Sequence, residues 1–421
     1  MKQIIKKGSF FTLLFMLLGC LSLYAADNDL ITEQITIQLE KAGTLPDRIG
    51  SIRKYKITNL KIIGEINGTD WRMIREMAGR DDRGNSTDGK LSVLDLSEAK
   101  IVEGGDWYYN NYYYKYYTSN DKIGSRAFED CSGLTSLTLP AGITEIGSDA
   151  FSGCSGLTSL TLPAGITKIG NAVFHNCSGL TSLTLPAGIT EIGSGAFRGC
   201  YGLTSLNLPA GITWIGSSAF EGCSGLSSLN LPAGITEIRF GTFRGCSGLT
   251  SLNLPAGITE IGEGAFDGCS GLTSLNLPAG ITEIGWNAFY GCSGLTSLNL
   301  PAGITEIGGC AFWGCRRLTS IYAYAEKVPK IDSKAFKGFD AKKCTLYVPM
   351  GTRDDYRLSN FGDYFENIVE FDATGIDKTT TSTDVEEVTR YSVNGQRLSA
   401  PIKGLNIVKY SDGSVKKVTV R

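Results

Sequence analysis

The stretch Cys131-Ser-Gly-Leu-Thr-Ser-Leu-Thr-Leu-Pro-Ala-Gly-Ile-Thr-Glu-Ile-Gly-Ser-Asp-Ala-Phe-Ser-Gly153 decides the fold, because the chain repeats it almost unchanged. Cysteines recur every 23 residues, at positions 131, 154, 177, 200, 223, 246, 269, 292 and 315. Eight full units therefore occupy residues 131–314. A strict repeat of this length predicts a solenoid, in which each unit forms one coil and stacked coils share one core.

The first half of each unit predicts a short strand. Leu137 and Leu139 alternate with polar residues, so their side chains face the same side of the strand. Pro140 then ends the strand because proline has no N–H to donate.

The second half of each unit predicts a return path with little regular structure. Ile143 and Ile146 are expected to point inward, and the segment that contains them can form a second short strand. Ala150 and Phe151 are expected on a short helical or 3₁₀ turn before the coil closes at the next cysteine.

The Leu-x-x-Leu-x-Leu-Pro strand, the Ile-x-x-Ile-Gly turn and the Ala-Phe-x-Gly-Cys closure together resemble the leucine-rich repeats of BspA-type bacterial surface proteins, over roughly residues 55–371. The resemblance implies a β-rich α/β repeat solenoid with a parallel sheet on one face and short turns or 3₁₀ segments on the other. Caps at both ends and a small antiparallel β tail complete the expected fold class. The asparagine ladder of the commoner leucine-rich repeats is missing. Short turns replace long helices on the outer side, so we expect weaker curvature than in a helix-backed horseshoe.

The predicted domain organisation follows from where the repeat begins, drifts and stops. It comprises a signal peptide at 1–26, an N-terminal cap with irregular first repeats at 27–130, regular repeats at 131–314, degenerate repeats with a C-terminal cap at 315–372, a linker at 373–390 and a small β tail at 391–421.

The first residues predict export, because a basic start precedes an apolar stretch that is short for a membrane span. Two processing routes remain open. Leu17-Leu-Gly-Cys20 resembles a lipobox, in which Cys20 would be lipidated, whereas ordinary cleavage would fall after Ala25 or Ala26. The protein is expected outside the cytoplasm, at the cell surface or secreted, and at the outer membrane if Cys20 is lipidated.

The C-terminal residues predict three or four antiparallel strands, because Asn394-Gly395 and Asp412-Gly413 are two-residue hairpin signals. The stretch from Tyr391 to Arg421 resembles the C-terminal sorting tails of type IX secretion. A small structural hairpin unit is the alternative.

The N-terminal cap is expected to be mixed in secondary structure. Residues 57–63 predict a strand, and residues 70–78 predict a helix with Thr69 or Asp70 as its N-cap. A tyrosine-rich insertion at 107–117 interrupts the first repeat. It can either contact a ligand or cover the first coil.

The chain offers few groups for catalysis. His175 is the only histidine, which excludes most imidazole-based acid–base or nucleophile arrangements. No phosphate loop or Cys-x-x-Cys pair is present, and 40 basic residues nearly balance 42 acidic ones. We therefore expect no enzyme activity, no cofactor, no metal and no nucleic-acid partner.

The cysteines of the repeat are expected to be buried free thiols, because coils in register point every Cβ the same way, which is poor geometry for disulfides. Cys310 and Cys344 fall outside the period, and a bond among them and Cys315 remains open.

Three repeated surfaces are candidate binding sites. The first is the outward strand column of Ser and of Thr or Asn, which includes Asn253, Asn276 and Asn299. The second is a glutamate column, for which a solvated face is the expected meaning. The third is the varied turn edge, where aromatic residues gather in the later units and arginine adds an interface-type anchor. Its candidates are Trp214, Phe240, Arg244, Trp286, Tyr290 and Trp313. Drift at unconstrained sites is the alternative for this edge.

These features predict a non-enzymatic, adhesin-like binding protein that recognises an extracellular or host-matrix protein through the solenoid. The resemblance implies this function, because BspA-type proteins are associated with attachment to matrix and to other cells. The alternative is a glycan-binding surface protein that uses the Ser/Asn column or the exposed aromatics. Membrane contact is expected only through a lipid anchor.

Overall fold

The computed structural model describes residues 30–338, 343–373, 387–392, 397–398, 403–410 and 415–420. Cys20 and the Asn394-Gly395 and Asp412-Gly413 turn signals lie outside these residues. The chain divides into two compact units, the first ending at Phe371 and the second beginning at Asp372.

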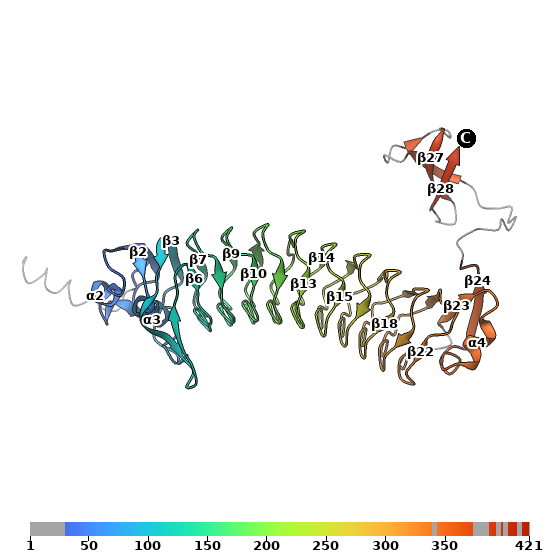
Figure 1. Ribbon diagram of the computed structural model, residues 1–421, viewed down its shortest axis with the longest axis horizontal. Coiled ribbons are helices and arrows are strands. Elements are labelled where there is room, and N and C mark those ends of the chain that lie inside the picture. Colours follow the sequence, from blue (N-terminus) through green and yellow to red (C-terminus); the bar gives the residue numbers. More distant parts are fainter. Residues whose placement is uncertain are drawn as a thin grey trace, which may run out of the picture. The chain divides into compact units, whose positions relative to one another are not determined.

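The first unit is a row of stacked coils, which confirms the predicted leucine-rich-repeat solenoid (Figure 1). The Ser-Leu-Thr or Ser-Leu-Asn segments of the coils form one side, which we call the strand face. Partner residues in it are one repeat apart, as in the parallel pair Ser182 and Ser159. Its regular strands are β7 (Ser136–Thr138), β9 (Ser159–Thr161), β11 (Ser182–Thr184), β14 (Ser228–Asn230), β16 (Ser251–Asn253) and β19 (Ser297–Leu300).

A second set of parallel strands lies along the coils, as the Ile-Thr-Glu-Ile segment allows. We call it the glutamate ladder, because glutamate leads most of its two-residue strands. They are β6 (Lys122–Ile123), β8 (Glu145–Ile146), β10 (Lys168–Ile169), β12 (Glu191–Ile192), β13 (Trp214–Ile215), β15 (Glu237–Ile238), β17 (Glu260–Ile261), β18 (Glu283–Ile284), β20 (Glu306–Ile307) and β22 (Lys330–Ile331).

The segment that closes each coil, between the Ile-Gly pair and the next cysteine, forms the turn edge. It consists of consecutive hydrogen-bonded turns, such as the one closed by Ser152 N donating to the Asp149 carbonyl at 3.1 Å, so the expected short turns on this side of the coil are confirmed. The turns of the regular coils do not continue into a longer helix, because each begins with a left-handed residue, such as Asp149 with φ of 56°. Alternate N–H groups then bond to the next coil, as Phe151 N donates to the Val173 carbonyl at 2.9 Å.

The core is a continuous ladder of identical side chains. Phenylalanine rings from Phe128 to Phe336 stack with centroid spacings between 5.1 and 5.6 Å. Beside them every repeat cysteine is buried and free, as predicted. The repeat thiols from Cys154 to Cys315 donate across coils, as Cys177 Sγ does to the Phe151 carbonyl at 3.0 Å. The described Cys310 and Cys344 are also free, so the disulfide alternative does not apply.

The N-terminal cap combines strands and helices over residues 30–118. Its elements are β1 (Ile35–Leu39), α2 (Leu45–Ile49), the 3₁₀ helix η1 (Arg53–Tyr55), β2 (Asn59–Ile66), α3 (Gly68–Met77), β3 (Val93–Ile101), β4 (Gly104–Asn110) and β5 (Lys115–Thr118). Strands β1, β2 and β3 continue the strand face in parallel to β7.

Helix α3 begins earlier than predicted. Asn67 is its N-cap, and neither Thr69 nor Asp70 has that role. The Asn67 side chain accepts a hydrogen bond from Thr69 N at 3.1 Å, and Asp70 accepts one from Asn67 N at 2.9 Å. This reciprocal capping box satisfies backbone donors that would otherwise be unpaired, which is why the helix starts at Gly68.

The C-terminal end of the first unit has two longer strands, a helix and a final strand. They are β21 (Ser320–Ala323), β23 (Thr345–Pro349), α4 (Arg353–Leu358) and β24 (Asn367–Phe371). In the second unit, β25 (Glu387–Ser392), β26 (Arg397–Leu398), β27 (Gly404–Tyr410) and β28 (Val415–Val420) form an antiparallel sheet in the order β26-β25-β27-β28. The antiparallel β tail of the predicted fold is confirmed.

Candidate functional site

The turn edge is the most variable surface of the solenoid, and its side chains pair along the row of coils. Several residues that directly follow a core phenylalanine contact their counterpart one coil away. Arg198 and Glu221 form an ion pair at 3.1 Å, and so do Arg244 and Asp267. Burial raises the pKa of Asp267, and the neighbouring Arg244 opposes that rise. Arg244 is therefore already engaged within the protein.

Farther along the same column, the charges give way to aromatic rings. Tyr290 and Trp313 stack with ring centroids 6.2 Å apart and an interplanar angle of 30°. The Lys337 ammonium lies 4.9 Å from the centre of the Trp313 ring. The structure thus brings together two of the predicted site residues and adds a lysine that the sequence interpretation did not include.

Trp286 is 59% exposed, and its ring packs over two glycines of the next coil, Gly308 and Gly309. A Cβ built at Gly308 would meet the Trp286 ring at 3.0 Å, and one at Gly309 would meet it at the same distance. Other coils carry Ser, Asn, Phe, Glu or Trp at the position of Gly309. The Trp286 ring therefore occupies the space that a side chain at Gly308 or Gly309 would fill, and its outer surface is exposed to solvent.

The two remaining aromatic candidates are held apart from this group. Phe240 is 47% exposed, and Glu263 stands between Phe240 and Trp286 in the same column. Trp214 lies in β13 of the glutamate ladder, where the Arg239 guanidinium covers its ring at 5.3 Å. Since Arg239 directly precedes Phe240, this pair connects the ladder to the turn edge.

Among the described residues, the strand face carries two kinds of polar side chain: threonine hydroxyls that bond to the neighbouring coil, and asparagine amides that make no hydrogen bond. Threonines at the start of the strand segment donate to the previous coil, as Thr181 does to the Thr158 carbonyl at 3.0 Å. In the described part of the chain, the side-chain amides of the outward asparagines make no hydrogen bond and are exposed. These are Asn207, Asn230, Asn253, Asn276 and Asn299. The predicted residues Asn253, Asn276 and Asn299 therefore form an open column of amide donors and acceptors.

This asparagine column ends at an aromatic cluster that the sequence interpretation missed. Tyr322 is aligned with Asn299 in the next strand, and Tyr347 is aligned with Tyr322. The two tyrosine rings stack at 4.4 Å with an interplanar angle of 7°. Tyr347 follows Tyr322 by 25 residues instead of 23, so the period alone does not place the two rings together.

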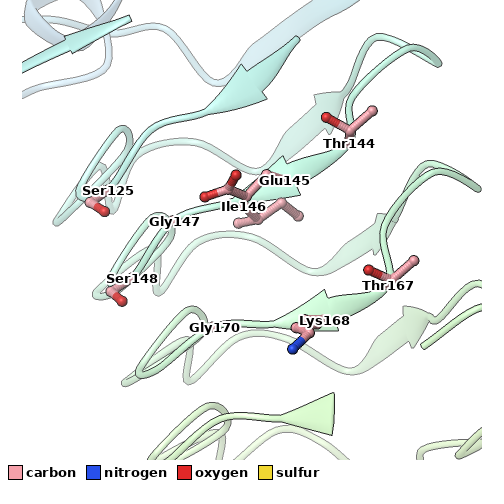
Figure 2. A pocket seen from close by; sticks show the side chains of 9 residues that line it. All are labelled: Ser125, Thr144, Glu145, Ile146, Gly147, Ser148, Thr167, Lys168 and Gly170. Carbon is pink, nitrogen blue, oxygen red and sulfur yellow. The ribbon is translucent and has the colours of Figure 1, made fainter. Parts of the chain in front are cut away.

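The glutamate ladder is largely neutralised in its first coils. Lys122 pairs with Glu145 at 2.5 Å, and Lys168 pairs with Glu191 at 2.8 Å. Figure 2 shows Glu145 and Lys168 on adjacent strands, lining a hollow of about 430 Å³ with serine and threonine hydroxyls. Because both charges already have partners, this hollow offers no reactive group, and the predicted solvated face fits it.

The tyrosine insertion forms the hairpin of β4 and β5, which projects from the first coils in teal in Figure 1. Its base is anchored, because Tyr108 is buried and donates to the Ser125 carbonyl at 2.8 Å. Its tip exposes Tyr112, Tyr113 and Tyr114, at 92%, 87% and 68%. The insertion therefore both covers the cap and presents aromatic side chains.

The repeat thiols lie in the core and not on these surfaces. Burial raises the pKa of Cys131 to about 11 and that of Cys177 to about 12, so the thiols stay protonated. Within the described residues, no group of three or more His, Cys, Asp or Glu side chains is arranged to hold a metal. No described helix is long and apolar enough to span a membrane.

The fold and the repeated surfaces define a leucine-rich-repeat protein. Residues 113–227 and 213–343 match the family described as BspA type leucine rich repeat region, and these matches cover more than half of the chain. The chain belongs to this family. A search of curated proteins finds no match.

Several solved structures are similar to this chain. A leucine-rich repeat protein from Bacteroides ovatus is 26% identical, with 63% of this chain and 67% of that chain covered and a TM-score of 0.49. A leucine rich repeat protein from T. pallidum is 34% identical, with 37% and 73% covered and a TM-score of 0.35. A leucine rich cell surface protein from Faecalibacterium prausnitzii is 24% identical, with 81% and 88% covered and a TM-score of 0.39.

Proposed function

We propose that this protein is an adhesin-like, non-enzymatic binding protein that recognises an extracellular or host-matrix protein through its turn edge. The observation that supports this is the gathering of large rings on one edge of a uniform repeat, where Phe240, Trp286 and Tyr290 are exposed and Trp313 is half-buried. Exposed aromatic side chains are common anchors of protein interfaces. Preset stacking of Tyr290 on Trp313 reduces the entropy lost on binding.

The test compares full-length protein with a variant that carries Trp286→Ser and Trp313→Ser. Other coils have serine at both positions, so the variant keeps the repeat intact. Binding to immobilised collagen, laminin and fibronectin is measured by surface plasmon resonance. We expect at least one ligand to bind the native protein and the double variant to lose at least about tenfold in affinity.

Tyr201→Ser is the matched control, because Tyr201 is also exposed and equivalent positions of other coils carry serine. Its affinity should equal that of the native protein. If no matrix protein binds, or if the control loses as much affinity as the double variant, the turn edge is not the recognition surface.

Recognition of a glycan on the strand face is the second candidate function. The free amides of Asn253, Asn276 and Asn299 favour it, because each presents donors and acceptors that the protein does not use. A glycan array tests it, with bulky replacements of Asn253 and Asn276 expected to abolish the signal.

Export to the cell surface or secretion is part of the proposal. Its support is the apolar N-terminal stretch, together with the cell-surface description of a similar solved protein. The domain boundaries proposed from the sequence include a sorting tail at 391–421, and Cys20 is the proposed lipidation site if the lipobox is used. Deletion of 391–421 should retain the protein in the periplasm, and Cys20→Ala should abolish labelling by radioactive palmitate.

A further inference from the structure

The strand face near the C-terminal end of the solenoid combines a rigid aromatic ring with free amides. Tyr322 is packed on one face by Tyr347 at 4.4 Å. Phe371 meets Tyr322 edge-on at 5.8 Å and 85°, and it meets Tyr324 in the same way at 5.2 Å. These contacts fix the orientation of the Tyr322 ring before any ligand arrives.

The other face of Tyr322 is turned toward the asparagine column. Tyr322 and Asn299 are direct partners in adjacent strands, and Asn276 is bridged to Asn299 on the far side. The asparagine side chain is much shorter than that of tyrosine. The outer part of the Tyr322 ring therefore stands above Asn299 as a wall at the end of an amide-lined floor.

The floor carries hydrogen-bonding groups but no charge. Its outward residues in the last regular coils are Ser274, Asn276, Ser297, Asn299 and Ser320. Successive parallel strands lie about 4.8 Å apart, which is close to the length of one pyranose unit in an extended chain. Consecutive sugars can thus meet consecutive asparagines.

We infer that this surface is a binding site for the end of a neutral, extended polysaccharide. One sugar ring packs its apolar C–H face on Tyr322 above Asn299, and the hydroxyls of that sugar and the next bond to Asn299 and Asn276. An uncharged floor matches an uncharged ligand, because a charged chain would lose hydration without gaining an opposite charge. The inference rests on the glycan-binding candidate and not on protein recognition at the turn edge.

The experiment is isothermal titration calorimetry on the full-length protein with cellohexaose, laminarihexaose and mannohexaose. A hexamer of galacturonic acid serves as the charged counterpart. We expect at least one neutral hexamer to bind and the charged hexamer to bind at least about tenfold more weakly.

Two variants follow the composition of the repeat itself and so avoid a folding defect. Tyr322→Asn extends the asparagine column, and Asn276→Thr with Asn299→Thr restores the residue of the first three coils. Each variant should reduce the affinity for the neutral hexamer at least about tenfold, while the circular dichroism spectrum stays unchanged. Asn207→Thr, distant from the wall, is the matched control and should leave the affinity unchanged.

The inference is overturned if no neutral hexamer binds, if Tyr322→Asn binds as well as the native protein, or if the galacturonic acid chain binds equally well. The turn-edge variant with Trp286→Ser and Trp313→Ser separates the two sites. This variant should retain its affinity for the neutral hexamer at the strand face even if it no longer binds a matrix protein. Matrix binding that persists without glycan binding would refute only the strand-face site.

Discussion

Phe220 sits in the middle of the phenylalanine stack, and its replacement by leucine tests whether the rings stabilise the solenoid beyond their burial. The ring is fully buried, with centroids 5.4 Å from Phe197 and 5.6 Å from Phe243. Leucine stays apolar but cannot stack. Each aromatic pair contributes about 0.5–1.5 kcal/mol beyond area burial, so losing two pairs should cost about 1–3 kcal/mol of unfolding free energy.

A double-mutant cycle separates stacking from the change in volume. Phe220→Leu combined with Phe243→Leu should show a coupling of about 0.5–1.5 kcal/mol, because the two rings touch. Phe220→Leu combined with Phe289→Leu should be additive within about 0.5 kcal/mol, because two coils intervene and each coil contacts only its neighbours.

The assay is guanidinium unfolding of the full-length variants followed by far-ultraviolet circular dichroism. Equal coupling for the adjacent and the distant pair would refute the stacking argument. A cost below about 0.5 kcal/mol for Phe220→Leu alone would refute it as well.

Three further outcomes follow from the described contacts. Burial raises the pKa of the repeat thiols, to about 12 for Cys177, whereas in the unfolded chain the thiol has its ordinary pKa near 9. The unfolding free energy should therefore be constant below pH 9 and fall as the pH rises toward 12. Each such thiol contributes about 1.4 kcal/mol per pH unit in that window, and a flat profile from alkaline denaturation would contradict buried protonated thiols. Asn67→Ala removes the capping box and should cost about 1 kcal/mol in chemical denaturation, whereas Thr44→Ala, at the N-cap of α2 with no side-chain cap bond, should cost less. Replacing Tyr112, Tyr113 and Tyr114 by serine should leave the melting temperature unchanged because these rings are exposed, and a clear drop would show that the hairpin tip supports the fold.

The sequence predicted the repeat architecture because every coil has the same neighbours. Identical units in register place leucine on leucine and phenylalanine on phenylalanine, so the period of 23 determines the core, the buried free cysteines and the outward asparagines. The predicted start of α3 was wrong, because the short polar segment before the helix contains several residues that can serve as its N-cap. Only the packed cap shows that Asn67 and Asp70 bond reciprocally.

The tertiary structure decided what happens where the repeat is broken. Tyr322 and Tyr347 meet because a longer coil brings residues 25 apart into register, which the period does not indicate. Trp286 packs over Gly308 and Gly309 and remains exposed, because the next coil has no side chains there to cover it. A fixed period determines which equivalent positions stack, whereas the contacts of the varied side chains depend on the sizes of their neighbours in space.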